Sequence, residues 1–75
     1  MTRPRHLEKR SLSLAGHRTS VALEPAFWAV LDEAARRRRL PLAALVAEID
    51  AARSDPALPL ASALRLFALA EAQRR

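Results

Sequence analysis

The feature that most constrains this fold is the stretch Gly16 to Pro25, where an extended pattern runs directly into a helical one. Val21 and Leu23 alternate with Ser20 and Ala22, which is the two-residue period of a strand with one buried face and one open face. A single short strand is not stable in water, so it needs a partner strand. The simplest partner is a second copy of the chain, which predicts a homodimer.

A second alternating stretch leaves another pairing open. Serine and leucine alternate from Ser11 to Leu14, and the only glycine of the chain, Gly16, lies between the two alternating stretches. This glycine either permits a hairpin turn that brings the two stretches together or marks a bulge in one longer ribbon. We expect the ribbon over about residues 11–24. Residues 1–10 lack apolar periodicity and are expected to form a basic flexible arm.

Three helices are expected after the ribbon, over about residues 25–39, 41–53 and 60–73. Pro25 and Pro41 suit first helical positions, where the missing N–H costs nothing. In each segment, apolar residues recur at spacings of three and four. The wide apolar face of the third helix predicts packing on the first two helices. The alternative is that this face stays partly open for a protein partner.

Composition limits the remaining classes of function. A 75-residue chain buries only about 60% of its unfolded surface, which favours a partner. The absence of cysteine excludes disulfides and thiolate metal sites, and His6 and His17 lack metal-site spacing. One glycine cannot build a glycine-rich phosphate loop, and no nucleophile elbow is present. We therefore expect no metal, no cofactor and no enzyme. No apolar run approaches ~20 residues, so we expect a cytoplasmic protein without membrane contact.

The positive charge is concentrated near the N-terminus. The formal net charge is +5; residues 1–20 hold five Lys and Arg against Glu8 alone, and residues 21–75 hold eight Arg against seven Asp and Glu. The two parts thus carry +4 and +1, which is typical of a nucleic-acid footprint on the ribbon and its arm. A solubilising tail is the alternative. A membrane-surface or RNA-binding role is supported by charge alone and ranks last.

These elements resemble those of the ribbon-helix-helix DNA-binding proteins. The resemblance rests on Gly16-His17-Arg18-Thr19-Ser20-Val21, Leu23-Glu24-Pro25, Phe27-Trp28, Leu42 to Asp50 and Ser62 to Phe67. Within that family, the chain resembles more specifically a bacterial subgroup of small ribbon-helix-helix domain proteins. The resemblance covers residues 11 to about 70. It implies a mainly α fold with a short N-terminal β-ribbon and an added C-terminal helix, in an intertwined homodimer.

The resemblance also implies a function. We expect a sequence-specific DNA-binding protein, a transcriptional regulator of the repressor or antitoxin-like kind, that reads the major groove with a two-chain β-ribbon. The alternative is a non-catalytic dimeric protein-interaction module that uses the C-terminal helix.

Site residues follow from the same resemblance. The face opposite Val21 and Leu23 would contact bases through Arg18, Ser20 and Ala22. If the strand register were shifted by one residue, His17 or Thr19 would contact bases instead, but Val21 would then be exposed. Ala22 departs from the polar residue usual there, and Pro41 replaces the usual Ser or Thr cap of the second helix. The expected phosphate contacts are Arg3, Arg5, Lys9, Arg10, Arg38, Arg39 and the amides of Leu42 and Ala43. The expected dimer core is Val21, Leu23, Phe27, Trp28, Leu31, Leu45, Val46 and Ile49.

Overall fold

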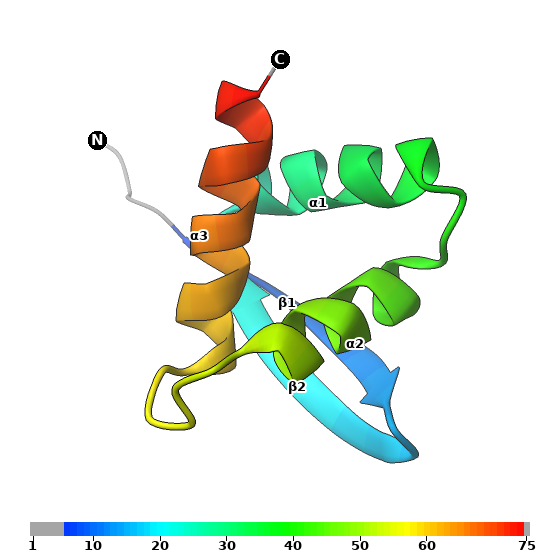
Figure 1. The fold of residues 1–75 in the computed structure, drawn as a ribbon, viewed down its shortest axis with the longest axis vertical. Coiled ribbons are helices and arrows are strands. Elements are labelled where there is room, and N and C mark those ends of the chain that lie inside the picture. The colour runs from blue at the N-terminus through cyan, green and yellow to red at the C-terminus, as the bar shows by residue number, and fades with distance from the viewer. Residues whose placement is uncertain (1–5, 75) are drawn as a thin grey trace.

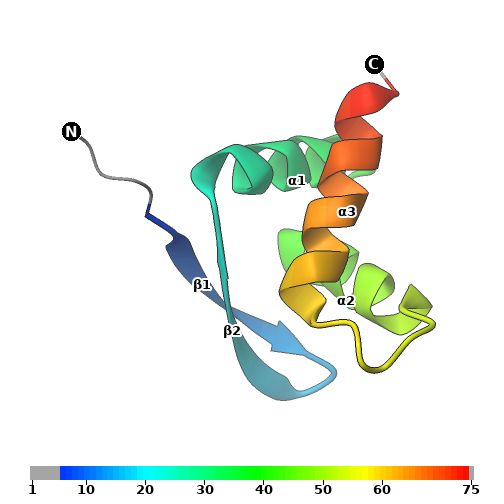
Figure 2. The same cartoon turned by 90° about the vertical axis from the view of Figure 1, so that its left-hand side faces the viewer.

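The computed structural model describes residues 6–74 as a β-hairpin followed by three helices (Figure 1). The elements are β1 (Glu8–Leu14), β2 (His17–Leu23), α1 (Pro25–Arg37), α2 (Leu42–Ala52) and α3 (Leu60–Gln73). The predicted mainly α fold with an N-terminal β-ribbon and an added C-terminal helix is confirmed. Figure 2 shows the helices gathered on one side of the hairpin, so that the other side of the hairpin is left uncovered.

The partner of β2 is β1 of the same chain. The two strands pair antiparallel, from Glu8 opposite Leu23 to Leu14 opposite His17. Ala15 and Gly16 form the connecting turn with φ values of 51° and 83°, and two positive φ values make it the turn type that matches the twist of a hairpin. Of the pairings left open by the sequence, the structure has the hairpin. The structure contains one chain, so the intertwined homodimer stays a prediction.

The first strand begins earlier than the sequence pattern predicts, because polar contacts hold its start. Residues 8–10 were expected in the flexible arm, yet they belong to β1. The Arg10 guanidinium lies 4.7 Å from the ring centroid of Trp28 and donates to Asp32 at 3.0 Å and to Glu8 at 2.8 Å. The Trp28 indole N–H donates to the backbone carbonyl of Glu8 at 2.7 Å. The spacing of apolar residues cannot reveal this start of the strand, because the half-buried Arg10 holds it through polar contacts.

The core lies between the inner face of the hairpin and the helices. Leu23, Leu31, Val46 and Leu64 have no exposed surface, and burying each such side chain contributes about 1.5–3 kcal/mol. In the packing, α2 contacts β1, and α3 contacts β2 and α1. The described chain therefore has a continuous core of its own, to which both strands and all three helices contribute.

Candidate nucleic-acid interface

The uncovered side of the hairpin carries hydroxyl and basic side chains. Residues that pair across an antiparallel ladder point to the same face, and three such pairs point away from the helices. We call these six residues the ribbon face: Lys9 opposite Ala22, Ser11 opposite Ser20, and Ser13 opposite Arg18. All are exposed except Ala22, which is half-buried. The ribbon face contains no acidic residue, so it presents donors and positive charge to any ligand.

The ribbon face brings together the three residues predicted to contact bases. Arg18, Ser20 and Ala22 alternate with the buried Val21 and Leu23, so the strand has the preferred register. His17 and Thr19 belong to the opposite set of the ladder. The alternation of strand side chains thus separates a solvent face from a core face within β2.

Sequence reasoning missed two members of the ribbon face. Ser11 and Ser13 lie opposite Ser20 and Arg18, and the hydroxyl oxygens of Ser11 and Ser20 are 3.3 Å apart. Their alternation with Leu12 and Leu14 was the available signal. That signal points to a shared face only once the two stretches are paired as a hairpin.

Ion pairs neutralise most of the helical arginines and leave the ribbon face charged. Six arginines in the described part of the chain have acidic partners: Arg10, Arg36, Arg37, Arg38, Arg53 and Arg65. Among residues 6–74, the Lys and Arg side chains without such a partner are Lys9, Arg18, Arg39 and Arg74. Two of these four lie on the ribbon face. The unpaired charge is therefore enriched where an anionic ligand has access.

The residues predicted to contact phosphates fall into distinct environments. Lys9 and Arg39 are exposed. Arg10 is held by Asp32 and Glu8, as described above, and Arg38 donates two hydrogen bonds to Glu71 at 3.0 and 3.1 Å. Arg3 and Arg5 lie outside the described residues. The geometry thus favours Lys9 and Arg39 over the two paired arginines as free cations.

Arg39 lies in a strained backbone conformation where α1 ends. Its φ is 58°, a left-handed value at a position where glycine is usual. The Arg39 N–H donates to the Arg36 carbonyl at 3.1 Å, and the Leu40 N–H donates to the Ala35 carbonyl at 2.9 Å. These two bonds satisfy carbonyls at the helix end, as in a Schellman motif. A long basic side chain therefore occupies the turn that leads into α2.

The start of α2 presents backbone amides. Pro41 precedes the helix with an extended backbone and makes no side-chain cap. Its carbonyl accepts from the N–H groups of Ala44 and Leu45 at 3.0 and 3.2 Å. The N–H groups of Leu42 and Ala43 belong to the first helical turn, whose amides have no acceptor within the helix. Such amides suit an anion, because the helix dipole is positive there.

Glu71 forms a buried ionic cluster that sequence reasoning missed. Its side chain is 6% exposed and accepts from Arg37 at 2.6 Å as well as from Arg38. The hydrogen bonds from Arg38, with help from Arg37 and against the cost of burial, lower the pKa of Glu71 to about 2. The Arg38 guanidinium also lies 5.4 Å from the ring centroid of Phe67. This cluster fastens the end of α1 to α3.

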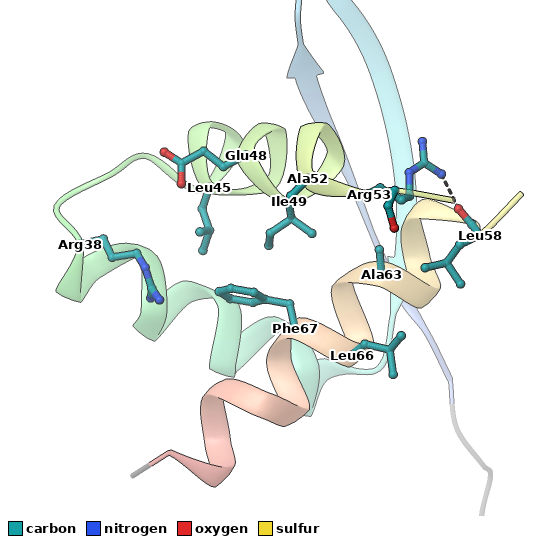
Figure 3. Close-up of a pocket in the computed structure, with 11 residues that line it drawn as sticks. Arg38, Leu45, Glu48, Ile49, Ala52, Arg53, Leu58, Ala63, Leu66 and Phe67 are labelled. Atoms are coloured by element: carbon teal, nitrogen blue, oxygen red, sulfur yellow. Dashed lines mark hydrogen bonds between the residues drawn. The ribbon is translucent and has the colours of Figure 1, made fainter. Parts of the chain in front are cut away.

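A second surface feature is a groove between α2 and α3 (Figure 3). Its volume is about 490 Å³, and Figure 3 shows Ile49 and Leu45 of α2 facing Phe67 of α3 across it. Leu66, which lines the groove, and Leu69, one turn further along α3, are more than half exposed, at 58% and 51%. The third helix therefore packs on the domain as predicted and also keeps an apolar strip in solvent.

The predicted dimer-core residues lie in the core of the single chain. Six of them are buried: Val21, Leu23, Trp28, Leu31, Leu45 and Val46. Phe27 and Ile49 are partly buried and pack against the core. This burial needs no second chain, and a contact of these residues across a dimer stays a prediction.

Two other kinds of site are not found in the described residues. Residues 6–74 contain no group of three or more His, Cys, Asp or Glu side chains able to hold a metal ion. No helix in the same range is long and apolar enough to cross a membrane.

A two-stranded ribbon with an uncovered basic face, mounted on a small helical core, is typical of proteins that bind nucleic acid through a β-ribbon. The family model described as a ribbon-helix-helix domain matches residues 7–72, and the chain belongs to this family. The family predicted from the sequence is thus confirmed, and the narrower bacterial subgroup stays a prediction. No curated protein and no solved structure matches the chain.

Family membership carries a general function. Ribbon-helix-helix domains form a family of DNA-binding regulators that are generally non-catalytic. They bind DNA as dimers.

Proposed function

We propose that this protein is a sequence-specific DNA-binding transcriptional regulator, of the repressor or antitoxin-like kind, that acts in the cytoplasm as a homodimer. The observation that carries the proposal is the ribbon face. It exposes Arg18 and Ser20 on an uncovered strand, and ion pairs elsewhere occupy six of the nine arginines among residues 6–74. The ribbon face enters the major groove, which admits a two-stranded ribbon.

Three side chains of β2 supply the base contacts. The Arg18 guanidinium is suited to bidentate donation to O6 and N7 of guanine. The Ser20 hydroxyl donates to or accepts from either kind of base edge, and Ala22 touches a thymine methyl group. Because the Ala22 side chain has no polar atom, only Arg18 and Ser20 of these three residues can form side-chain hydrogen bonds to bases.

Phosphate contacts position the ribbon and carry no sequence information. Lys9, Arg39 and the amides of Leu42 and Ala43 supply them from the described residues, and Arg3 and Arg5 supply them from the arm. Arg10 and Arg38 are poorer candidates than the sequence predicted, because their guanidinium groups are already held by carboxylates. For either of them to bind phosphate, an internal ion pair must break.

The test is selection of DNA fragments with purified protein, followed by binding of the enriched duplex and a scrambled duplex. Arg18→Ala is expected to weaken discrimination by about 1–3 kcal/mol at one base position. The matched control is Arg74→Ala, which removes an equally unpaired arginine at the far end of α3 and is expected to leave base preference unchanged. Equal binding of both duplexes by the unchanged protein would contradict the proposal.

A second candidate function is a dimeric protein-interaction module that uses α3. The observation that favours it is the strip of Leu66 and Leu69 beside the α2–α3 groove, since exposed apolar patches mark interaction sites. A Leu66→Ser/Leu69→Ser variant discriminates between the two functions. If the protein lacks DNA binding and this variant loses an interaction with a protein partner that the unchanged protein makes, the interaction module is the better description.

A further inference from the structure

We propose that β1 flanks the two-chain ribbon on its outer side, and that Ser11 and Ser13 of β1 contact the phosphates that line the major groove. This inference rests on the proposed function, in which β2 of each chain supplies the base contacts. It deepens that function, because it gives a role to the two members of the ribbon face that sequence reasoning missed.

The hairpin leaves one edge of β2 open to a second chain. The sheet of the described residues has two strands, in the order β1–β2, so no strand of residues 6–74 covers the other edge of β2. Such an edge presents unpaired N–H and C=O groups and pairs readily with another strand. Pairing of β2 with β2 of a second copy then gives a four-stranded sheet, in which β1 of each chain is outermost.

The width of the major groove decides what each strand can reach. Neighbouring strands lie about 4.8 Å apart, so the two inner strands lie about 2.4 Å from the centre of the sheet and the two outer strands about 7 Å from it. The groove is about 12 Å wide, which places its walls about 6 Å from its centre. The inner strands therefore lie over base edges, and the outer strands lie over the phosphates at the walls.

The serines of β1 suit this outer position. Ser11 and Ser13 lie opposite Ser20 and Arg18, on the same face of the sheet, and both are exposed. Serine hydroxyls donate to phosphate oxygens. Because their side chains are short, the outer strand can approach the DNA backbone closely while the longer Arg18 reaches into the groove. The ribbon face has no acidic residue, so none of its side chains repels the phosphates.

Lys9 adds a positive charge to the same row of side chains. It is exposed and has no acidic partner among residues 6–74. Arg10, the next residue along, faces inward to Asp32 and Glu8. We call Lys9, Ser11 and Ser13 the outer row. The outer row follows the arm along the chain, so the phosphate contacts proposed for Arg3 and Arg5 continue into β1.

The first test removes one hydroxyl of the outer row. Ser13→Ala is expected to weaken binding by about tenfold, as for a lost hydrogen bond to a charged group, and to do so equally on the enriched duplex and on its single-base substitutions. Ser13→Thr keeps the hydroxyl and is expected to restore binding. Ser54→Ala is the matched control, since it removes an exposed hydroxyl from the loop between α2 and α3. Far-UV circular dichroism checks that each variant is folded.

The outcomes separate this inference from the proposed function. If Ser13→Ala binds every duplex as the unchanged protein does, the hydroxyl contacts no phosphate. If it changes base preference, as Arg18→Ala is expected to do, β1 reads bases. Either result overturns the inference while the proposed function stands. If the unchanged protein shows no base preference, the proposed function fails and the inference fails with it.

A second test determines the order of the strands in the dimer without DNA. The chain has no cysteine, so single cysteines can be introduced at Ser20, the middle residue of β2, and at Ser11, which lies opposite it in β1. With β2 innermost, the two copies of Ser20 lie on neighbouring strands, whereas the two copies of Ser11 lie about 14 Å apart. A thiol-reactive cross-linker shorter than that separation is expected to join two chains of Ser20→Cys and not of Ser11→Cys. The reverse result, or no cross-linking of either variant in a protein that sediments as a dimer, would overturn the inference.

Discussion

At the scale of single residues, Arg39 combines backbone strain with an unpaired charge. A non-glycine residue with a left-handed backbone costs about 1–2 kcal/mol, and glycine occupies such positions without that cost. Arg39 has this backbone at the end of α1 and an exposed side chain. Strain of this kind is typical of functional sites. We therefore interpret Arg39 as a residue retained for its side chain.

We predict that replacing Arg39 by glycine increases the stability of the protein and weakens its binding to DNA. Arg39→Gly is expected to raise the free energy of unfolding by about 0.5–1 kcal/mol, because it relieves the strain at the cost of some chain entropy. The same change is expected to weaken DNA binding for all sequences alike. Urea unfolding and duplex binding measure the two effects.

Arg39→Ala is the control for this prediction. It removes the guanidinium but keeps a side chain at the left-handed position, so the loss of binding should match that of Arg39→Gly without the gain in stability. If both variants bind DNA as tightly as the unchanged protein, Arg39 is not a phosphate contact.

At the scale of elements, the sequence predicts the strands and helices well where local patterns determine them. Alternation around Val21 predicts the strand, and Pro25 is the first residue of α1 as expected, whereas Pro41 lies just before α2, which begins at Leu42. Arg10 and Glu71 could not be predicted in the same way. Arg10 faces inward against Trp28, and the arginine partners of Glu71 lie 33 and 34 residues away. Contacts over such distances depend on the packing of α3 against α1.

The ionic cluster of Glu71 makes that packing depend on pH. The pKa of Glu71 is lowered from 4.5 to about 2 by its hydrogen bonds to Arg38 and Arg37. A carboxylate whose pKa is lower in the folded state stabilises the fold above its unfolded pKa. Its contribution is therefore complete above about pH 4.5 and is lost as the pH falls toward about 2.

Glu71→Gln is expected to destabilise the protein by about 2 kcal/mol at pH 7, which is typical of a lost hydrogen bond to a charged group. The difference from the unchanged protein should shrink as the pH falls from 4.5 to about 2. Denaturant unfolding across this range measures it. Glu33→Gln, which affects an exposed ion pair with Arg36, should cost less than about 1 kcal/mol. A difference for Glu71→Gln that does not change with pH would contradict the assigned role of its charge.

At the scale of the whole molecule, charge is divided between the helices and the N-terminal region. Four carboxylates of the helical region pair with arginines of the same region, namely those of Glu24, Glu33, Asp50 and Glu71, whereas Asp32 of α1 pairs with Arg10 of β1. The first 20 residues carry +4 of the net +5, as counted from five basic residues and one acidic residue. A ligand with dense negative charge is therefore drawn to the hairpin side of the molecule, and its affinity should depend on salt.

The last prediction uses this division to separate the arm from the ribbon. If a dimer neutralises about six phosphates, the logarithm of affinity should fall with the logarithm of salt concentration at a slope of roughly −5. Arg3→Ala/Arg5→Ala should make this slope shallower and weaken all duplexes alike, whereas Arg18→Ala should also relax base preference. Titrations of enriched and scrambled duplexes over a salt series measure both effects. A slope near zero would exclude binding driven by phosphate contacts. Equal losses of base preference in both variants would contradict the proposal that the arm contacts phosphates and the ribbon contacts bases.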